Sequence, residues 1–241
     1  MISIIIPAFN EEGNIPRIIT ELVPVLNKIK SSYEIIVVDD GSSDGTVEKT
    51  EDIIRQNKRI MLVKHGVNRG LGCAVKTGVE NARGDVIIIL DADFTFHPSH
   101  IPELYNAYLA TGYDCIIGSH FGKGGKTEGV PFHRLLLSKA INLLYSIIIG
   151  KKVSSISSIF RLYRAEKLKE ITIETSGFDI NAEILFKLIQ RKAKIMEVPV
   201  VLTTRKYGES KIRISKEISN NLKLLNKVLL WRMKYLLGNM R

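Results

Sequence analysis

Two carboxylates close an apolar stretch of the chain and could hold a metal ion. Asp91 and Asp93 follow the apolar residues 86–90, with only Ala92 between them. A buried carboxylate without a partner is costly, and a single Asp in such a place is usually a turn or helix-capping residue. Two acids one residue apart can instead share Mg²⁺ or Mn²⁺, which keeps part of its coordination shell for substrate phosphates. The pair therefore predicts a site for a metal ion and a phosphorylated substrate.

Polar side chains also follow other apolar stretches that we interpret as strands. They are Asn10, Glu11 and Glu12 after the first strand, Asp39 and Asp40 after the second, and Ser119 and His120 after the fifth. In a parallel α/β sheet, ligands bind beyond the carboxyl ends of the strands. We therefore expect these side chains and the Asp91/Asp93 pair to lie along one edge of a sheet.

Short apolar runs alternate with helical patterns along the chain. Such strands, separated by helices, predict an α/β fold with a mostly parallel central sheet that helices cover on both faces. The expected strands are residues 3–10, 33–42, 59–65, 85–93, 114–119, 157–164 and 193–202. The expected helices are residues 14–29, about 44–57, 70–82, about 132–148, 179–192 and 213–237.

Composition and charge narrow the functional classes. The 241 residues, 45% hydrophobic and 25% charged, suffice for one large α/β domain or two small ones. Cys73 and Cys115 form no C-x-x-C pair, so we expect a reducing cytosol and no zinc site. We see no signal peptide and no run of ~20 apolar residues, so we expect no membrane crossing by the chain itself. Of the net charge of +10, residues 201–241 carry +8, which argues against a nucleic-acid-coating protein.

Five motifs in order resemble the family-2 glycosyltransferases with the nucleotide-diphosphosugar (GT-A) fold. They are IIIPAFNEEGNI, YEIIVVDDGSSDGT, NRGLGCAVKTGVENARGD, LDADFTFHP and CIIGSHF. Residues 177–211 resemble the dolichol-phosphate mannosyltransferase branch and its polyprenyl-phosphate hexosyltransferase relatives, and the likeness covers about nine-tenths of the chain. It implies a single catalytic domain over residues 1–211, with a nucleotide-binding part at about 1–121 and an acceptor part at about 122–211.

The resemblance also implies roles for individual residues. Asp91 and Asp93 match the metal-binding pair, and Asp39 or Asp40 matches the residue that meets the base or ribose, although either acid could serve only an Asx-turn. The residues expected to contact the nucleotide sugar are Pro7, Phe9, Glu11, Asp39, Asp40, Ala92, Asp93, His120 and Ser210. The residues expected to act in catalysis are Asp91, Asp93, Arg134, Arg205 and Lys211.

A departing nucleoside diphosphate needs positive charge around it. A divalent cation supplies this as a Lewis acid, and cationic side chains can assist. Arg134 follows the Gly-rich loop 122–129, whereas Arg205, Lys206 and Lys211 lie in the turn TTRKYGESK, which closes over the phosphates in the resembling branch. For one such residue alone, a solvated surface cation is the better interpretation, but Arg205 and Lys211 together favour function.

The acceptor decides whether a base is needed. A hydroxyl requires a general base within reach, whereas a phosphate monoester has a second pKa near 6 and is already nucleophilic at pH 7. The chain lacks the Glu-Asp pair and the Gln-x-x-Arg-Trp motif of many hydroxyl-glycosylating relatives, which favours a phosphate acceptor. Asp179 and Glu183 stay open as bases.

Four departures from the branch pattern leave the sugar and acceptor open. His120 replaces an Arg that ends Gly-Ser-Arg, Ser155 replaces an Asp, Ile159 replaces a Gly, and Thr95 stands where Gln or His is common. At neutral pH, His120 could contact phosphate only partly as a cation.

Three hypotheses follow from these observations. The first is an inverting transferase that moves mannose from GDP-mannose, or glucose from UDP-glucose, to a polyprenyl phosphate at the cytoplasmic membrane face. The second keeps the fold but uses a glycan or other hydroxyl acceptor. The third is a nucleotide-sugar-binding protein without catalysis.

The C-terminal segment 212–241 reads as a basic amphipathic helix. At 100° per residue, one face carries Ile218, Leu222, Leu225, Leu229, Met233 and Leu236. The opposite side carries Lys216, Lys223, Lys227 and Lys234. The helix could pack on the core, or lie on an anionic membrane with Trp231 and Tyr235 near the headgroups. A polyprenyl-phosphate acceptor requires the latter or a membrane-protein partner.

Overall fold

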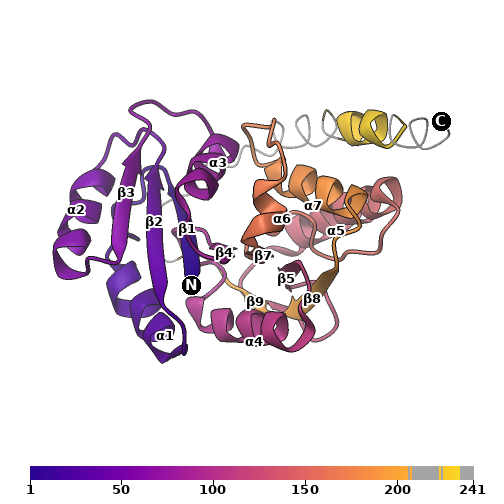
Figure 1. Ribbon diagram of the computed structural model, residues 1–241. Coiled ribbons are helices and arrows are strands. Elements are labelled where there is room, and N and C mark those ends of the chain that lie inside the picture. The colour runs from indigo at the N-terminus through magenta and orange to yellow at the C-terminus, as the bar shows by residue number, and fades with distance from the viewer. Residues whose placement is uncertain (206, 208–222, 224, 234–241) are drawn as a thin grey trace.

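A seven-stranded sheet forms the centre of the computed structural model (Figure 1). The structure describes residues 1–205, 207, 223 and 225–233. The strand order is β3-β2-β1-β4-β7-β5-β8, in which β7 runs antiparallel to both neighbours and the other pairings are parallel. The expected mostly parallel α/β sheet is confirmed. Its strands are β1 (Ile2–Ala8), β2 (Tyr33–Asp39), β3 (Ile60–Lys64), β4 (Val86–Ile89), β5 (Cys115–Ser119), β7 (Arg161–Arg164) and β8 (Ile195–Pro199).

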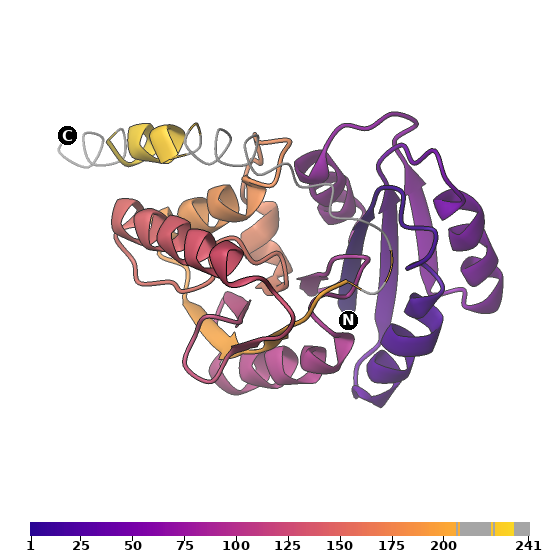
Figure 2. The same cartoon turned by 180° about the vertical axis from the view of Figure 1, so that it is seen from behind.

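Helices cover both faces of the sheet, because alternate strand residues point to opposite faces (Figures 1 and 2). Ile5, Ile36 and Ile87 belong to a core with α3, α5, α6 and α7. Their neighbours Ile4 and Ile35 belong to a second core with α1, α2 and α4. The helices are α1 (Val23–Lys28), α2 (Thr46–Gln56), α3 (Leu71–Asn81), α4 (Ile101–Thr111), α5 (Phe132–Ile149), α6 (Ala165–Lys169) and α7 (Ile180–Gln190).

Several elements differ from the sequence-based expectation. The helix expected over 14–29 begins as a π-helical turn, η1 (Ile18–Leu22), before α1. The expected strand 193–202 divides into β8 and β9 (Val201–Leu202), and β9 pairs with β6 (Lys126–Thr127) in a second sheet. Helices α4, with the short 3₁₀ turn η2 (Pro98–His100) before it, and α6 were not expected.

The C-terminal helix packs on the core over its described part, residues 225–233. Leu225 and Val228 are buried, and Trp231 stacks on Phe186 of α7 with ring centroids 5.8 Å apart. Leu229 is exposed. The described part of the helix therefore packs on the core through a face that includes the partly buried Trp231, and its contact with a membrane stays a prediction. Within the described residues, we find no helix with the length and apolarity to cross a bilayer.

Candidate active site

The polar ends of β1, β2, β4 and β5 meet at one edge of the sheet. β4 is parallel to β1, and β5 has the same direction as β4 because β7 runs antiparallel between them. The ends of β4 and β5 are therefore two strand spacings apart, about 10 Å. Phe96, which follows the Asp91/Asp93 pair, bridges this distance, because its ring lies 5.7 Å from the ring of His120.

The turn after β4 fixes the two carboxylates. The carbonyl oxygen of Asp91 accepts a hydrogen bond of 3.2 Å from the amide of Phe94, which has a φ of 52°. Asp93 Oδ1 accepts the amide of Thr95 at 2.9 Å, and Asp93 Oδ2 lies 3.0 Å from a guanidinium nitrogen of Arg205. The sequence-predicted pair thus lies beside one of its predicted cations.

Negative charge is concentrated at this loop. Burial raises the pKa of Asp91 well above its ordinary value, and the charges of Asp93 and Glu11 raise it further, whereas Arg205 lowers it. Acids crowded in this way favour a bound cation.

The donor set fits a divalent ion that is shared with a substrate. In the part of the chain that the structure describes, no three Asp, Glu, His or Cys side chains are placed to hold an ion by themselves. Mg²⁺ is usually bound through one or two carboxylates plus substrate phosphates. Asp91 and Asp93 therefore fit Mg²⁺ or Mn²⁺ whose remaining ligands come from a diphosphate.

The loops after β1 and β2 are joined by hydrogen bonds. The Asn10 amide donates to Ser42 Oγ at 2.8 Å, and Asn10 Oδ1 accepts from the Ser43 amide at 2.8 Å. The Glu11 amide donates to Thr46 Oγ1 at 2.7 Å. These bonds hold the loop with Glu11 against the sheet edge.

Two of the predicted nucleoside contacts begin this same loop. Pro7 lies within β1 opposite Val38 of β2, and Phe9 follows the strand and is half-buried. Both therefore lie near the carboxyl end of β1, where the predicted site is.

Asp39 and Asp40 have different surroundings. Asp40 Oδ1 lies 2.7 Å from His65 Nδ1, and the Asp40 carboxylate accepts the amides of Arg69 and Gly70 at 2.9 and 2.8 Å. Asp40 thereby holds the loop that leads into α3. Asp39 accepts the Ser42 amide at 3.3 Å in the expected Asx-type turn.

His120 lies at the end of β5 and is a neutral side chain. The residue is 7% exposed, and its ring packs against Phe96 and Phe121 at centroid distances of 5.7 and 4.1 Å. Burial lowers the pKa of His120 to about 4. Without a bound phosphate this favours a neutral imidazole at pH 7, and the expected contact of His120 with phosphate stays a prediction.

The two proposed bases lie near α7 in different settings. Glu183 is fully buried and accepts hydrogen bonds from Lys187 and from the Glu174 and Thr175 amides. These donors lower the pKa of Glu183 against the opposing effect of burial. Burial raises the pKa of Asp179.

Other predicted cations and phosphate contacts lie outside the described residues. These are Lys206, Ser210 and Lys211, together with the side chain of Arg134 on α5. Arg205 is the predicted phosphate-binding cation whose contact with the Asp93 carboxylate is described.

Two charged residues that contact the loops near the strand ends were missed by sequence reasoning. Arg17 donates a hydrogen bond to the carbonyl oxygen of Asp93, and Glu197 of β8 accepts the amides of Ser154 and Ser155. Each is a charged residue inside an apolar run, the Arg17 run being 15–22. That pattern was the available signal, because a buried charge needs specific partners.

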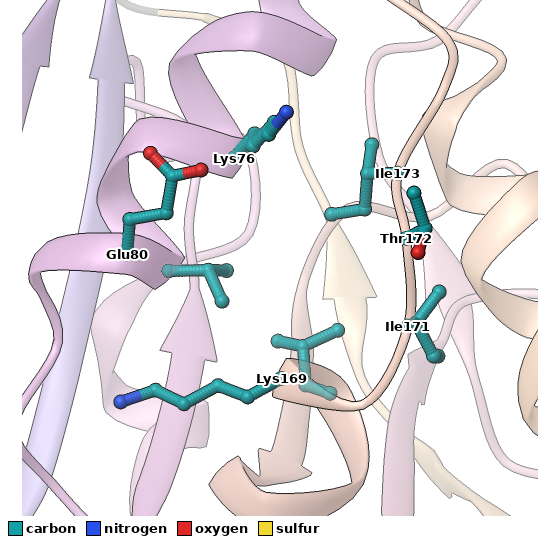
Figure 3. Close-up of a pocket in the computed structure, with 8 residues that line it drawn as sticks. Lys76, Glu80, Lys169, Ile171, Thr172 and Ile173 are labelled. Carbon is teal, nitrogen blue, oxygen red and sulfur yellow. The ribbon is translucent and has the colours of Figure 1, made fainter.

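A separate cavity of about 380 Å³ lies between α3 and the segment around α6 (Figure 3). Lys76 and Glu80 of α3 face Lys169, Ile171 and Ile173 across it. None of its lining residues belongs to the loops that carry the predicted carboxylates.

Comparison with known proteins places the chain in a family. Residues 3–172 match the family model of glycosyl transferase family 2. A dolichol-phosphate mannosyltransferase from Pyrococcus furiosus is 34% identical over 232 residues, which cover 95% of this chain and 64% of that protein. A polyprenol monophosphomannose synthase from Mycolicibacterium smegmatis is 31% identical over 216 residues, which cover 87% of this chain and 80% of that protein. The chain belongs to glycosyl transferase family 2, and it matches 64% of the archaeal relative's length.

Solved structures agree on the fold. Glucosyl-3-phosphoglycerate synthase from Mycobacterium tuberculosis superposes with a TM-score of 0.70 at 22% identity, covering 96% of this chain and 79% of that chain. A second structure of that enzyme contains Mn²⁺, uridine diphosphate and glucosyl-3-phosphoglycerate, with a TM-score of 0.69 at 22% identity and the same coverage. The expected GT-A architecture is confirmed.

Proposed function

We propose that the chain transfers a hexose from a nucleotide sugar to a polyprenyl (dolichyl) phosphate with inversion, and that the leading donor is GDP-mannose. The pair Asp91 and Asp93 at the end of β4, with Arg205 at 3.0 Å from Asp93, carries this proposal. The names of the two family relatives support mannose and a polyprenyl acceptor.

The residues around the pair would have distinct tasks. Asp91 and Asp93 would hold Mg²⁺ or Mn²⁺, which when bound neutralises the diphosphate leaving group as a Lewis acid. Arg205 would add positive charge beside the same oxygens. Asp39, rather than Asp40, would contact the base or ribose, because Asp40 already accepts the amides of the loop before α3.

The transfer itself is a single displacement. An acceptor phosphate oxygen forms a bond to the anomeric carbon while the bond from that carbon to the β-phosphate oxygen breaks. The nucleoside diphosphate leaves with the electron pair of the broken bond. A phosphate with a second pKa near 6 needs no base at pH 7.

A hydroxyl acceptor is the second candidate, with UDP-glucose as the second donor. It would require Asp179 as the base, since Glu183 accepts four hydrogen bonds and its pKa is lowered. The pKa of Asp179 is raised, and a general base is more effective when its pKa lies nearer the working pH. We therefore include hydroxyl acceptors in the test. A binding protein without catalysis is the third outcome.

We further propose that the protein works peripherally at the cytoplasmic face of a membrane, through an anionic lipid surface or a membrane-protein partner. Exposed apolar side chains on α5 and on the C-terminal helix support a lipid surface. They are Leu136, Leu143, Leu144, Ile147, Leu229, Leu230 and Met233. The two helices touch, because Arg232 donates to the carbonyl oxygen of Ile147 at 3.0 Å. Partitioning between vesicles and buffer, with and without anionic lipid, tests this proposal.

The test of the reaction uses the purified chain with Mg²⁺ or Mn²⁺ and radiolabelled GDP-mannose or UDP-glucose, with and without a polyprenyl phosphate. We expect label in the organic extract only when lipid is present, and only from one donor. Asp93→Asn should abolish transfer, whereas Asp52→Asn, on the exposed surface of α2, should leave it unchanged. Nucleotide release with hydroxyl acceptors alone would support the second candidate, and activity that survives Asp93→Asn would refute the metal assignment.

A further inference from the structure

Arg17 contacts the loop that carries both carboxylates. Its side chain is 8% exposed, and Nη1 donates a hydrogen bond of 2.6 Å to the carbonyl oxygen of Asp93. The guanidinium also lies over the ring of Phe94, with Cζ 5.0 Å from the ring centroid. One buried cation therefore holds two adjacent residues of the loop.

This part of the loop needs a restraint from outside. Phe94 has a φ of 52°, in the left-handed region that costs energy for a residue with a Cβ atom. Such a conformation persists only where surrounding contacts enforce it. If the Asp93–Phe94 peptide rotated, the φ of Phe94 would change and the Thr95 amide would move away from the Asp93 carboxylate, which now accepts it at 2.9 Å.

The same arginine reaches the loop after β1. Arg17 Nη1 donates to Asn14 Oδ1 at 3.0 Å, and Asn14 Nδ2 donates to Glu11 Oε2 at 2.6 Å. A chain of hydrogen bonds thus runs from Glu11 through Asn14 and Arg17 to the backbone of Asp93. It joins the loop of Glu11, where the family resemblance predicts a contact with the nucleotide sugar, to the loop that the proposed function assigns to the metal.

Glu21 fixes the orientation of the guanidinium. Arg17 Nε and Nη2 lie 2.9 and 3.0 Å from the two carboxylate oxygens of Glu21. His97 Nε2 lies 3.2 Å from Glu21 Oε2. Arg17 immediately precedes the π-helical turn η1, which contains Glu21, and such turns are frequent at functional sites. The fork of Arg17 is therefore preorganised with Nη1 directed at the loop.

We propose that Arg17 is a positioning residue that sets the Asp91/Asp93 carboxylates for a metal–nucleoside diphosphate complex and couples them to the loop of Glu11. The inference rests on the proposed function, because it assumes that this loop binds such a complex. Outer partners of metal ligands commonly change metal affinity by 10- to 100-fold when they are removed.

The test measures binding rather than turnover. Arg17→Gln and Arg17→Lys are compared with the unmodified chain for the dissociation constant of Mn²⁺ at saturating GDP, and separately UDP, by titration calorimetry. We expect Arg17→Gln to weaken Mn²⁺ binding about tenfold or more and Arg17→Lys by an intermediate factor, since Lys keeps the charge but not the fork. Hydrogen exchange without metal should be faster at the amides of Phe94 and Thr95 in both variants.

Arg164, the last residue of β7, provides a matched control because it lies opposite Val86 at the start of β4, at the other end of the strands from Asp91 and Asp93. It pairs with Asp114 at 3.1 Å, donates to the carbonyl oxygen of Gly112 at 3.0 Å and lies 5.5 Å from the Tyr108 ring centroid. Arg164→Gln thus removes the same kinds of contact and should change the dissociation constant less than twofold.

Four results would overturn the inference, and the last of them would also overturn the proposed function. Unchanged affinity in Arg17→Gln would do so, as would an equal loss in Arg164→Gln, which would indicate general destabilisation. If Arg17→Gln does not fold, the Mn²⁺ affinity of Arg17→Lys is the decisive measurement. An affinity equal to that of the unmodified chain would refute the positioning role of Arg17. If the unmodified chain binds no Mn²⁺ with either nucleotide, the proposed function fails together with the inference.

Discussion

Replacing Glu183 with Gln should destabilise the fold without acting directly on the reaction. Glu183 accepts the amides of Glu174 and Thr175 at 2.9 Å each, the Thr175 hydroxyl at 2.5 Å and Lys187 Nζ at 2.7 Å. Each oxygen takes two of these four donors. A carboxamide keeps one oxygen and turns its own NH₂ toward two donors, so at least two hydrogen bonds are lost.

The magnitude follows from the count of lost bonds. A hydrogen bond to a charged group contributes about 1.5–3 kcal/mol net. Two such losses in a fully buried position should therefore lower the free energy of unfolding by about 3 kcal/mol or more. For a chain of this size, that corresponds to a fall in Tm of roughly 6–12 °C.

Urea unfolding monitored by circular dichroism measures the effect. Glu174→Gln is the control, because Glu174 is half exposed in its ion pairs with Lys187 and Lys227 and should cost less than about 1 kcal/mol. The pKa of Glu183 is lowered in the fold from an ordinary value of 4.5, so its contribution is complete above that value and is lost as pH falls through the folded pKa. The difference between the unmodified chain and Glu183→Gln should shrink below pH 4.5. A variant with unchanged stability but no transfer would refute the structural role and support a catalytic base.

Three further outcomes are expected. Burial lowers the pKa of His120 to about 4, so its imidazole NMR signals should titrate near pH 4. The contribution of His120 to the free energy of unfolding should fall as pH drops from 6.5 toward 4. A titration midpoint near 6.5 would contradict its burial. Val228→Asp should detach the C-terminal helix and shift the fluorescence of Trp231, the single tryptophan, to longer wavelength, whereas Leu229→Asp on the exposed face should not. Gly72→Ala would place a Cβ atom 2.1 Å from a carbonyl oxygen of the loop that faces α3, so unfolding by urea should show a loss of about 1–3 kcal/mol.

The order of strands and helices was largely readable from the sequence because apolar runs and helical periodicity encode burial directly. The convergence of strand ends was likewise predictable, since it follows from parallel direction alone. The antiparallel direction of β7 could not be predicted from the sequence. The pattern of residues 157–164 is compatible with pairing in either direction, and contacts with distant segments determine which one forms. Helix α4 was missed although Pro102 in its first turn and Gly112 at its end are ordinary boundary signals.

Individual side chains were harder to assign than the edge on which they lie. Asp39 and Asp40 are adjacent and chemically identical, and only the fold brings the His65 ring and two amides to Asp40. The sequence left Glu183 open as a candidate base, because it does not show which hydrogen-bond donors surround a carboxylate. Sequence patterns locate burial and strand ends, whereas the donors around each charge depend on contacts between distant segments.

The position of β7 has a consequence for how the chain folds during synthesis. β1, β2, β3 and β4 complete their mutual pairings within the first 89 residues, but the other edge of β4 pairs with a strand that begins at Arg161. At about 5–20 residues per second, a ribosome needs roughly 4–14 s to make the intervening segment. Throughout that time β4 has an unpaired edge, and β5 has neither of its two partners. An exposed apolar edge is a template for aggregation, so the nascent chain is most dependent on chaperones between the completion of β4 and the emergence of β7.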